Sequence, residues 1–267
     1  MFIDTHCHLD ASEFDADRDA VIADALGAGI GRLVIPAVEV GNFESVARLA
    51  RRIPGAAYTL GIHPLYVERA AFEDLERLRH ALDSAMGDPQ FVGVGEIGLD
   101  HFVPGLDRAR QLQFFDAQLR LAREYKLPVI LHVRRAQDVI LGRLRRLSVI
   151  GGIAHAFNGS LQQAQAYAAL GFALGMGGAM TDPRALRIRT IARQMPLDDL
   201  VLETDAPDIA PIWRRGERNS PTELARICDC LAELRQLGAS QVRATTTCTA
   251  LRVLPRLRQF GQLHPPD

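Results

Sequence analysis

The chain has 267 residues, of which 31 are basic and 32 are acidic, so its formal net charge at pH 7 is −1. This balance excludes an overall basic field, which weakens the case for a polyanionic substrate without excluding one. No apolar run approaches the length of a membrane span, and the N-terminus lacks the basic and long apolar segments of a signal peptide. We therefore expect a cytoplasmic protein whose four cysteines are reduced.

Short apolar runs alternate with amphipathic stretches along the whole chain. An apolar strand precedes His6, and further strands are predicted at residues 32–38, 56–62, 91–97, 128–133, 151–157, 171–176 and 200–203. Helices are predicted at residues 14–29, 43–53, 72–86, 107–125, 136–147, 160–170, 183–195, 221–237 and 240–254. Asp107 and Ser160 are predicted to cap their helices, and Pro183 suits a first helical turn.

Eight strands that alternate with helices predict βαβ units and a parallel sheet. We therefore predict an α/β fold, and specifically a (β/α)8 TIM-type barrel, in a single domain over residues 1–262. Residues 263–267 are expected to form a disordered C-terminal tail. An open doubly wound sheet is the alternative, although no Gly-x-Gly-x-x-Gly phosphate loop follows the first strand.

Polar side chains end most of the predicted strands. Active sites of such barrels lie at the carboxyl ends of the strands, so these side chains are expected to converge. His6 and His8 follow the first strand, where alternation places them on one face and Cys7 on the other. The remaining residues of this kind are His63, Glu96, His132, His155, Glu203 and Asp205.

Six of these side chains are candidate metal ligands, too many for one tetrahedral ion and enough for two. They are His6, His8, Glu96, His132, His155 and Asp205. Imidazoles with carboxylates suit Zn, Mn, Ni or Fe, whereas carboxylates alone favour Mg. Glu96 has two oxygens with which to bridge two ions, and Asp205 is the candidate general base for a metal-activated water. The predicted reaction class is metal-assisted hydrolysis.

Six segments carry these residues: DTHCH at 4–8, GIHP at 61–64, GEIGLD at 95–100, LHVR at 131–134, HAFNG at 155–159 and LETDAP at 202–207. In this order they resemble the TatD-like metal-dependent hydrolases of the amidohydrolase superfamily, a family often described as deoxyribonucleases. The resemblance covers nearly the whole chain. It implies an α/β barrel, a divalent-metal site made of the same six ligands, and hydrolysis, commonly of phosphodiester bonds in DNA.

The resemblance also implies that His63 and Arg134 lie beside the metals and contact a substrate phosphate. Arg134 shares a face with His132 if the strand continues, and a guanidinium suits phosphate. His63 before a proline has the alternative of capping a turn. Arg135 is expected to be solvated, and Glu203 is open between a buried, hydrogen-bonded residue and a catalyst.

The chain departs from the family pattern at three places. His101-Phe102 replace an aromatic pair, Leu65 replaces a histidine, and Thr249 replaces an asparagine. None of these positions is a candidate ligand, and the first two lie near the expected mouth of the site. They therefore bear on substrate preference.

The sequence thus predicts a divalent-metal-dependent hydrolase that cleaves phosphodiester bonds, a deoxyribonuclease-type enzyme using two metal ions. An alternative keeps the metals and changes the substrate to a small ester, lactone, amide or phosphoester, which the near-neutral charge favours. A third possibility is a metal-binding barrel that acts as a scaffold or sensor without turnover. We expect DNA or a small phosphoester as the partner, with neither a membrane nor a stable protein partner.

Overall fold

Eight parallel strands form one sheet in the order β1 to β8, as the computed structural model of residues 1–259 shows. They are β1 (Phe2–Asp4), β2 (Ile30–Pro36), β3 (Ala56–Leu60), β4 (Phe91–Asp100), β5 (Val129–Arg134), β6 (Gly152–Ala154), β7 (Phe172–Met176) and β8 (Leu200–Leu202). The first and last strands meet where the N–H of Thr5 donates to the carbonyl of Leu202 at 3.1 Å. The predicted TIM-type barrel is confirmed, and the tail predicted at 263–267 lies outside the described residues.

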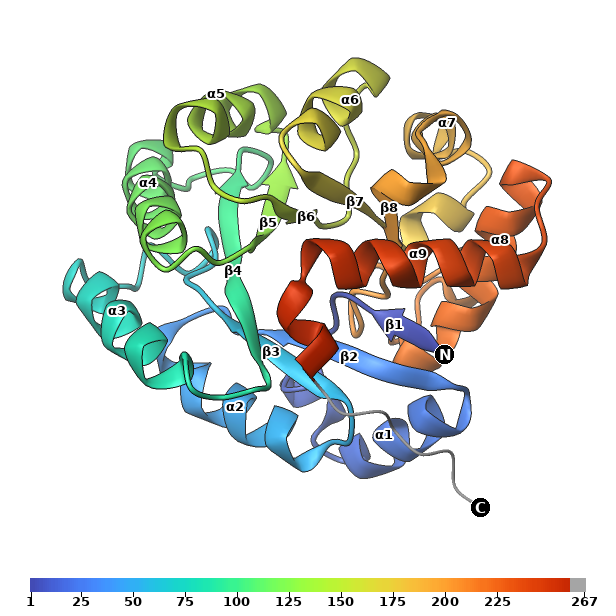
Figure 1. The fold of residues 1–267 in the computed structure, drawn as a ribbon, viewed down its shortest axis with the longest axis horizontal. Coiled ribbons are helices and arrows are strands. Elements are labelled where there is room, and N and C mark those ends of the chain that lie inside the picture. Colours follow the sequence, from blue (N-terminus) through green and yellow to red (C-terminus); the bar gives the residue numbers. More distant parts are fainter. Residues whose placement is uncertain (260–267) are drawn as a thin grey trace.

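Helices surround this ring of strands, and the last of them crosses it (Figure 1). The α-helices of the described part are α1 (Arg18–Gly27), α2 (Phe43–Arg52), α3 (Glu73–Ala85), α4 (Arg108–Glu124), α5 (Gln137–Leu147), α6 (Leu161–Ala169), α7 (Leu186–Gln194), α8 (Leu224–Arg235) and α9 (Ala239–Val253). None of the helices within residues 1–259 combines the length and the apolarity needed to cross a bilayer. The cytoplasmic location and the lack of a stable protein partner stay predictions.

Local hydrogen bonds explain where two of the helices begin. The side chain of Asp107 accepts hydrogen bonds from two backbone N–H groups of the first turn of α4, as predicted for an N-cap. Ser160 caps α6 in the same way, and its partner Gln163 completes a capping box. These two predicted starts are confirmed because the capping signal lies within four residues of chain.

Three predicted helix starts were wrong. The helix expected from residue 14 begins at Arg18, because residues 12–14 form the separate 3₁₀ turn η1 (Ser12–Phe14), which buries Phe14. Likewise η6 (Pro221–Glu223) precedes α8. The helix expected from Pro183 begins three residues later, since a turn that ends at Ala185 comes first.

The barrel interior begins with a layer of apolar side chains, one from each strand. This layer consists of Ile3, Val34, Ala57, Val92, Ile130, Ile153, Ala173 and Val201. Because alternate residues of a strand share a face, the side chains two positions further on point into the same interior. In β5 this residue is His132, and after β6 it is His155. The strand period therefore places polar side chains directly above an apolar floor.

The C-terminal part of the chain closes the barrel below this floor. Ala250, Val253, Leu254 and Leu257, from α9 and the following turn η7 (Pro255–Gln259), pack against it. The guanidinium of Arg256 donates hydrogen bonds to the carbonyls of Phe91 at 2.6 Å, Met86 at 3.0 Å and Asp88 at 3.0 Å. One end of the barrel is thus plugged, and the polar layer faces the other end.

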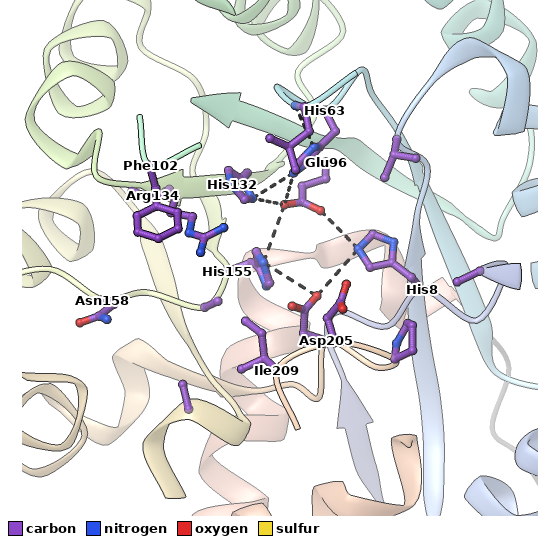
Figure 2. Close-up of a pocket in the computed structure, with 18 of the residues that line it drawn as sticks. His8, His63, Glu96, Phe102, His132, Arg134, His155, Asn158, Asp205 and Ile209 are labelled. Carbon is purple, nitrogen blue, oxygen red and sulfur yellow. Dashed lines mark hydrogen bonds and ion pairs between the residues drawn. The ribbon is translucent and has the colours of Figure 1, made fainter. Parts of the chain in front are cut away.

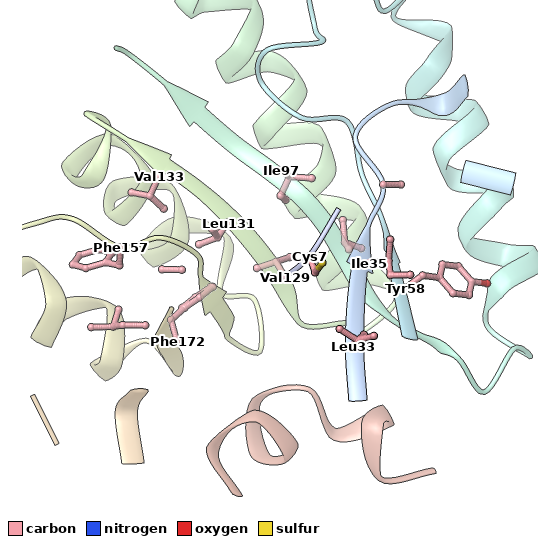
Figure 3. Close-up of a cluster of buried hydrophobic side chains, with 14 of the residues drawn as sticks. Cys7, Leu33, Ile35, Tyr58, Ile97, Val129, Leu131, Val133, Phe157 and Phe172 are labelled. Atoms are coloured by element: carbon pink, nitrogen blue, oxygen red, sulfur yellow. The ribbon is translucent and has the colours of Figure 1, made fainter. Parts of the chain in front are cut away.

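The outer faces of the strands pack against the surrounding helices and form a second apolar layer (Figure 3). Leu131 and Val133 of β5 and Phe172 of β7 belong to this layer. Cys7 is fully buried in it, as expected if Cys7 faces away from its two histidine neighbours. All four cysteines are free thiols.

We predict that Arg256→Ala lowers the free energy of unfolding by about 2 kcal/mol, because three backbone carbonyls lose a charged donor. Urea unfolding followed by circular dichroism would measure the change. Arg258→Ala, at an exposed position of the same turn, is the matched control and should leave stability within about 0.5 kcal/mol. Equal effects of the two substitutions would show that Arg256 does not anchor the plug.

Candidate metal centre

The predicted ligands surround one buried carboxylate, Glu96, which is 2 % exposed (Figure 2). Its Oε2 lies 3.1 Å from Nε2 of His6 and 3.4 Å from Nε2 of His8. Its Oε1 lies 2.9 Å from Nδ1 of His132 and 3.7 Å from Nε2 of His155. The two oxygens of one carboxylate therefore face two separate groups of imidazoles.

Asp205 lies between these two groups. Its Oδ1 is 3.5 Å from Nε2 of His6 and 3.9 Å from Nε2 of His155. The backbone of Asp205 has a φ of 59°, a left-handed conformation that Asp tolerates better than most residues. Its N–H donates to the carbonyl of His6 at 2.8 Å, which ties the loop after β8 to the segment after β1.

A buried amide holds the loop that carries Asp205. Nδ2 of Asn219 donates to the carbonyls of Thr204 and Asp208, each at 2.8 Å, so it brackets Asp205 from both sides. This role of Asn219 was not predicted from the sequence, because the positions it bonds to become neighbours only when the loop folds back.

His63 also reaches this centre, with its Nε2 3.3 Å from Oε1 of Glu96 and 3.0 Å from Nδ1 of His132. Its Nδ1 accepts the backbone N–H of Leu65 at 3.2 Å. A neutral imidazole has one donor and one acceptor nitrogen, so the bond from Leu65 assigns the proton to Nε2. Burial lowers the pKa of His63 to about 4, which keeps the ring neutral at pH 7. His63 therefore offers an N–H to the site, which favours the predicted contact with substrate over metal ligation.

Asp100 orients His132, a role that was not predicted from the sequence. Oδ2 of Asp100 lies 3.0 Å from Nε2 of His132, while its Oδ1 accepts the N–H groups of Phe102 at 2.8 Å and Val103 at 2.9 Å. A histidine that donates one ring N–H to a buried carboxylate presents the lone pair of its other nitrogen to a metal. The position of Asp100 at the end of the same strand as Glu96 was the available signal.

Glu203 has the same relation to His155. Its Oε1 lies 3.3 Å from Nδ1 of His155 and accepts the N–H of Ala156 at 2.6 Å. Gly175 of β7 makes room for it, because a Cβ at that position would collide with the carboxylate. The geometry favours the first of the two interpretations left open, a buried carboxylate that positions a histidine.

The spacing of the donor atoms fits a divalent cation. Nε2 of His6, Nε2 of His8 and Oε2 of Glu96 lie 3.1 to 3.4 Å from one another. Two ligands that are each about 2.1 Å from a zinc-like ion lie this far apart when they enclose an angle of about 95–108°. The same three side chains form one of the groups in residues 1–259 that can hold a metal ion.

Comparison with known protein families shows to which family this chain belongs. The model of the TatD related DNase family matches residues 3–255. This protein belongs to the TatD related DNase family. Membership confirms the resemblance seen in the six sequence segments, and with it the prediction of a metal-dependent hydrolase.

The curated relatives of this TatD family member match it over nearly their whole length. The metal-dependent hydrolase YjjV of Escherichia coli (strain K12) is 41% identical over 242 residues, which cover 90% of this chain and 93% of that protein. The 3'-5' ssDNA/RNA exonuclease TatD of Cronobacter sakazakii is 35% identical over 258 residues, with coverages of 94% and 96%. The crystal structure of the YjjV protein aligns with a TM-score of 0.91 at 39% identity and covers 95% of this chain and 98% of that one.

Carboxylates control the protonation of the imidazoles in this TatD family site. Burial acts to lower the pKa of His155, but Asp205, Glu203 and Glu96 outweigh it and raise that pKa to about 10. Burial likewise opposes the charge of His8, yet Glu96 and Asp205 raise its pKa to about 9. Burial raises the pKa of Asp205 to about 6 against the opposing effect of His155 and His8. The cluster therefore stabilises positive charge, whether a proton or a cation carries it.

We predict that the affinity for Zn²⁺ or Mn²⁺ rises between about pH 6 and about pH 8, because a cation must displace protons from the same nitrogens. The raised pKa values of His8 and His155 lie above this window, so protons compete throughout it. Calorimetric titration of the protein with metal at several pH values would measure the affinity. Titration in weak buffer would also measure the protons released on binding. Replacing the exposed His80 by Gln should change nothing, and a pH-independent affinity would contradict the assignment of these histidines.

We predict that Asp100→Asn weakens metal binding about 10-fold to 100-fold, because His132 loses the carboxylate that orients it. Metal content after dialysis against a graded chelator would measure the loss. Asp24→Asn, on the exposed face of α1, is the control of equal charge change. Unchanged metal content in the Asp100 variant would exclude the orienting role.

Proposed function

We propose that this TatD family member is a divalent-metal-dependent phosphodiesterase that cleaves DNA, a deoxyribonuclease-type enzyme. The observation that carries the proposal is the shared carboxylate of Glu96, which faces two groups of imidazoles with Asp205 between them. The name of the relative in Cronobacter sakazakii, a 3'-5' ssDNA/RNA exonuclease, supports this choice. So does the name of a 32% identical relative in Danio rerio, a putative deoxyribonuclease.

Two divalent ions are part of this proposal. His6, His8 and Oε2 of Glu96 would hold one ion, and Oε1 of Glu96 with His132 and His155 would hold the other. The imidazole content favours Zn, Mn, Ni or Fe over Mg. When bound, such ions polarise a phosphate oxygen and lower the pKa of a water molecule.

The side chains of the protein divide the remaining tasks. Asp205, with a pKa of about 6, is ionised at pH 7 and takes the proton of the attacking water. The oxygen of that water forms a bond to phosphorus while the bond from phosphorus to the departing sugar oxygen breaks, and the departing oxygen takes up a proton from solvent. Nε2–H of His63 donates to a phosphate oxygen, and the guanidinium of Arg134 pairs with the phosphate charge.

The second candidate function is hydrolysis of a small phosphoester, and the lining of the pocket gives it support. The site opens into a pocket of about 1000 Å³, near the upper end of the range for small-molecule sites. Arg134, Arg135 and Arg187 line it, but so do the acidic residues Asp10, Glu13 and Asp208. These carboxylates repel a polyanion that is long enough to reach them, whereas a small monoanion can bind in the pocket without contacting them.

We predict metal-dependent release of nucleotides from a labelled single-stranded oligonucleotide in the presence of Mn²⁺, Mg²⁺ or Zn²⁺. Chelation should abolish turnover, and added metal should restore it. Asp205→Asn should lower kcat about 10²-fold to 10⁴-fold through loss of the general base, whereas Asp24→Asn should not change it. Cleavage of small phosphoesters without cleavage of any nucleic acid would replace the first function by the second.

A further inference from the structure

Two consecutive arginines contact one aromatic ring at the mouth of the pocket. Cζ of Arg134 lies 4.0 Å from the ring centroid of Phe102, and Cζ of Arg135 lies 4.6 Å from the same centroid. All three residues line the pocket that opens from the candidate metal centre, and Figure 2 shows Phe102 beside Arg134. Consecutive residues of a strand normally point to opposite faces, so this shared contact needs a local cause.

The cause is a backbone turn directly after β5. The strand ends at Arg134, and Arg135 has a φ of 55°, in the left-handed region that non-glycine residues seldom occupy. This turn brings the side chain of Arg135 back to the same ring as that of Arg134. Backbone strain of this kind concentrates at functional sites, where the surrounding structure maintains it.

The loop after β4 maintains the position of the ring. Phe102 is 45% exposed, so it is not a core residue, yet its N–H donates to Oδ1 of Asp100 at 2.8 Å. The other oxygen of Asp100 lies 3.8 Å from Nη1 of Arg134 and 3.0 Å from Nε2 of His132. One buried carboxylate therefore positions the aromatic ring, the first arginine and a candidate metal ligand together.

The second arginine has no such carboxylate. Within residues 1–259, no Asp or Glu oxygen lies at ion-pair distance from Arg135, although its guanidinium contacts the same ring as that of Arg134. Two adjacent like charges with a single carboxylate partner attract an additional anion. Guanidinium groups bind phosphate oxygens through several directed N–H bonds.

We infer that Phe102, Arg134 and Arg135 form a two-arginine clamp, in which Arg134 contacts the phosphate to be cleaved and Arg135 contacts the next phosphate of the same strand. Arg134 lies two residues beyond His132 and Arg135 one residue further, so the second cation is farther from the metal centre along the chain. Phe102 is the positioning residue that aligns both guanidiniums. The inference rests on the proposed phosphodiesterase function, and it makes a chain with two consecutive phosphodiesters a better substrate than a single diester.

The test compares kcat/KM for an oligothymidylate with that for bis(p-nitrophenyl) phosphate, which has a single diester. Arg135→Asn removes the charge, and Asn tolerates the left-handed backbone, so the variant is expected to fold. The ratio of the two kcat/KM values should fall about tenfold, mainly through KM for the oligothymidylate, because a remote contact supplies binding rather than chemistry. The dependence of log KM on log salt concentration should lose about 0.7 of slope, the value for one phosphate of a single strand.

Control variants separate the effect of removing one positive charge from the effect of the position of that charge. Arg145→Asn, at an exposed position of α5, removes an equal charge and should leave the ratio unchanged. Phe102→Leu should lower kcat/KM for both substrates because both arginines lose their support, and Phe102→Tyr should restore most of the loss. Thermal unfolding of each variant would confirm that it folds.

The outcomes distinguish the two proposals. If the wild-type protein cleaves both substrates and Arg135→Asn leaves their ratio unchanged, the clamp is wrong and the phosphodiesterase function stands. If the wild-type protein cleaves neither substrate with any of the three metals, the proposed function fails and the clamp fails with it. A fall in the ratio that Arg145→Asn reproduces would show a general charge effect and would also overturn the clamp.

Discussion

A buried negative charge at Glu96 is the constraint on which the rest of this site depends. A carboxylate that is almost fully removed from water is unfavourable unless cations or hydrogen-bond donors surround it. Here histidines of several strands converge on its two oxygens, and their summed effect holds the pKa of Glu96 well below its usual range although burial acts to raise it. Removing those histidines from the barrel rim would leave an uncompensated charge, so the strands must bring them together.

The barrel makes this convergence possible because alternate residues of each strand point into its interior. Each strand contributes one apolar residue to the floor of the interior, and in β5 and after β6 the next residue on the same face is a histidine of the polar layer. Helix α9 and the turn after it plug the opposite end, so the polar layer has access to solvent only at the carboxyl ends of the strands. The same strands carry hydrophobic residues outward against the helices, which explains why so many of the apolar runs are continuous.

Carboxylates that contact the histidines connect the site to the residues around it. Glu203 supports His155, and Asp100 supports His132 while it also contacts Arg134 and fixes the loop of Phe102. The candidate metal centre and the arginine-lined mouth of the pocket therefore share a common support. In this TatD family member, the departures from the family pattern near residues 65 and 102 line that mouth and involve none of the six candidate ligands.

The sequence by itself determined the barrel, the order of its elements and the strand ends from which the six candidate ligands project. These follow from the spacing of apolar residues, which differs between helices and strands. It also determined that His6 and His8 face together while Cys7 faces the core. Only the tertiary structure decided the proton position on His63, the pairing of Asp100 with His132 and the bracket that Asn219 forms around Asp205. Arg135 is exposed, as predicted, and only the tertiary structure showed that the turn after β5 also brings it to the ring of Phe102. Each of these roles depends on a contact between residues of different loops. Hydrophobic residues do not recur at regular intervals in loops, so the sequence pattern cannot predict which residues come into contact.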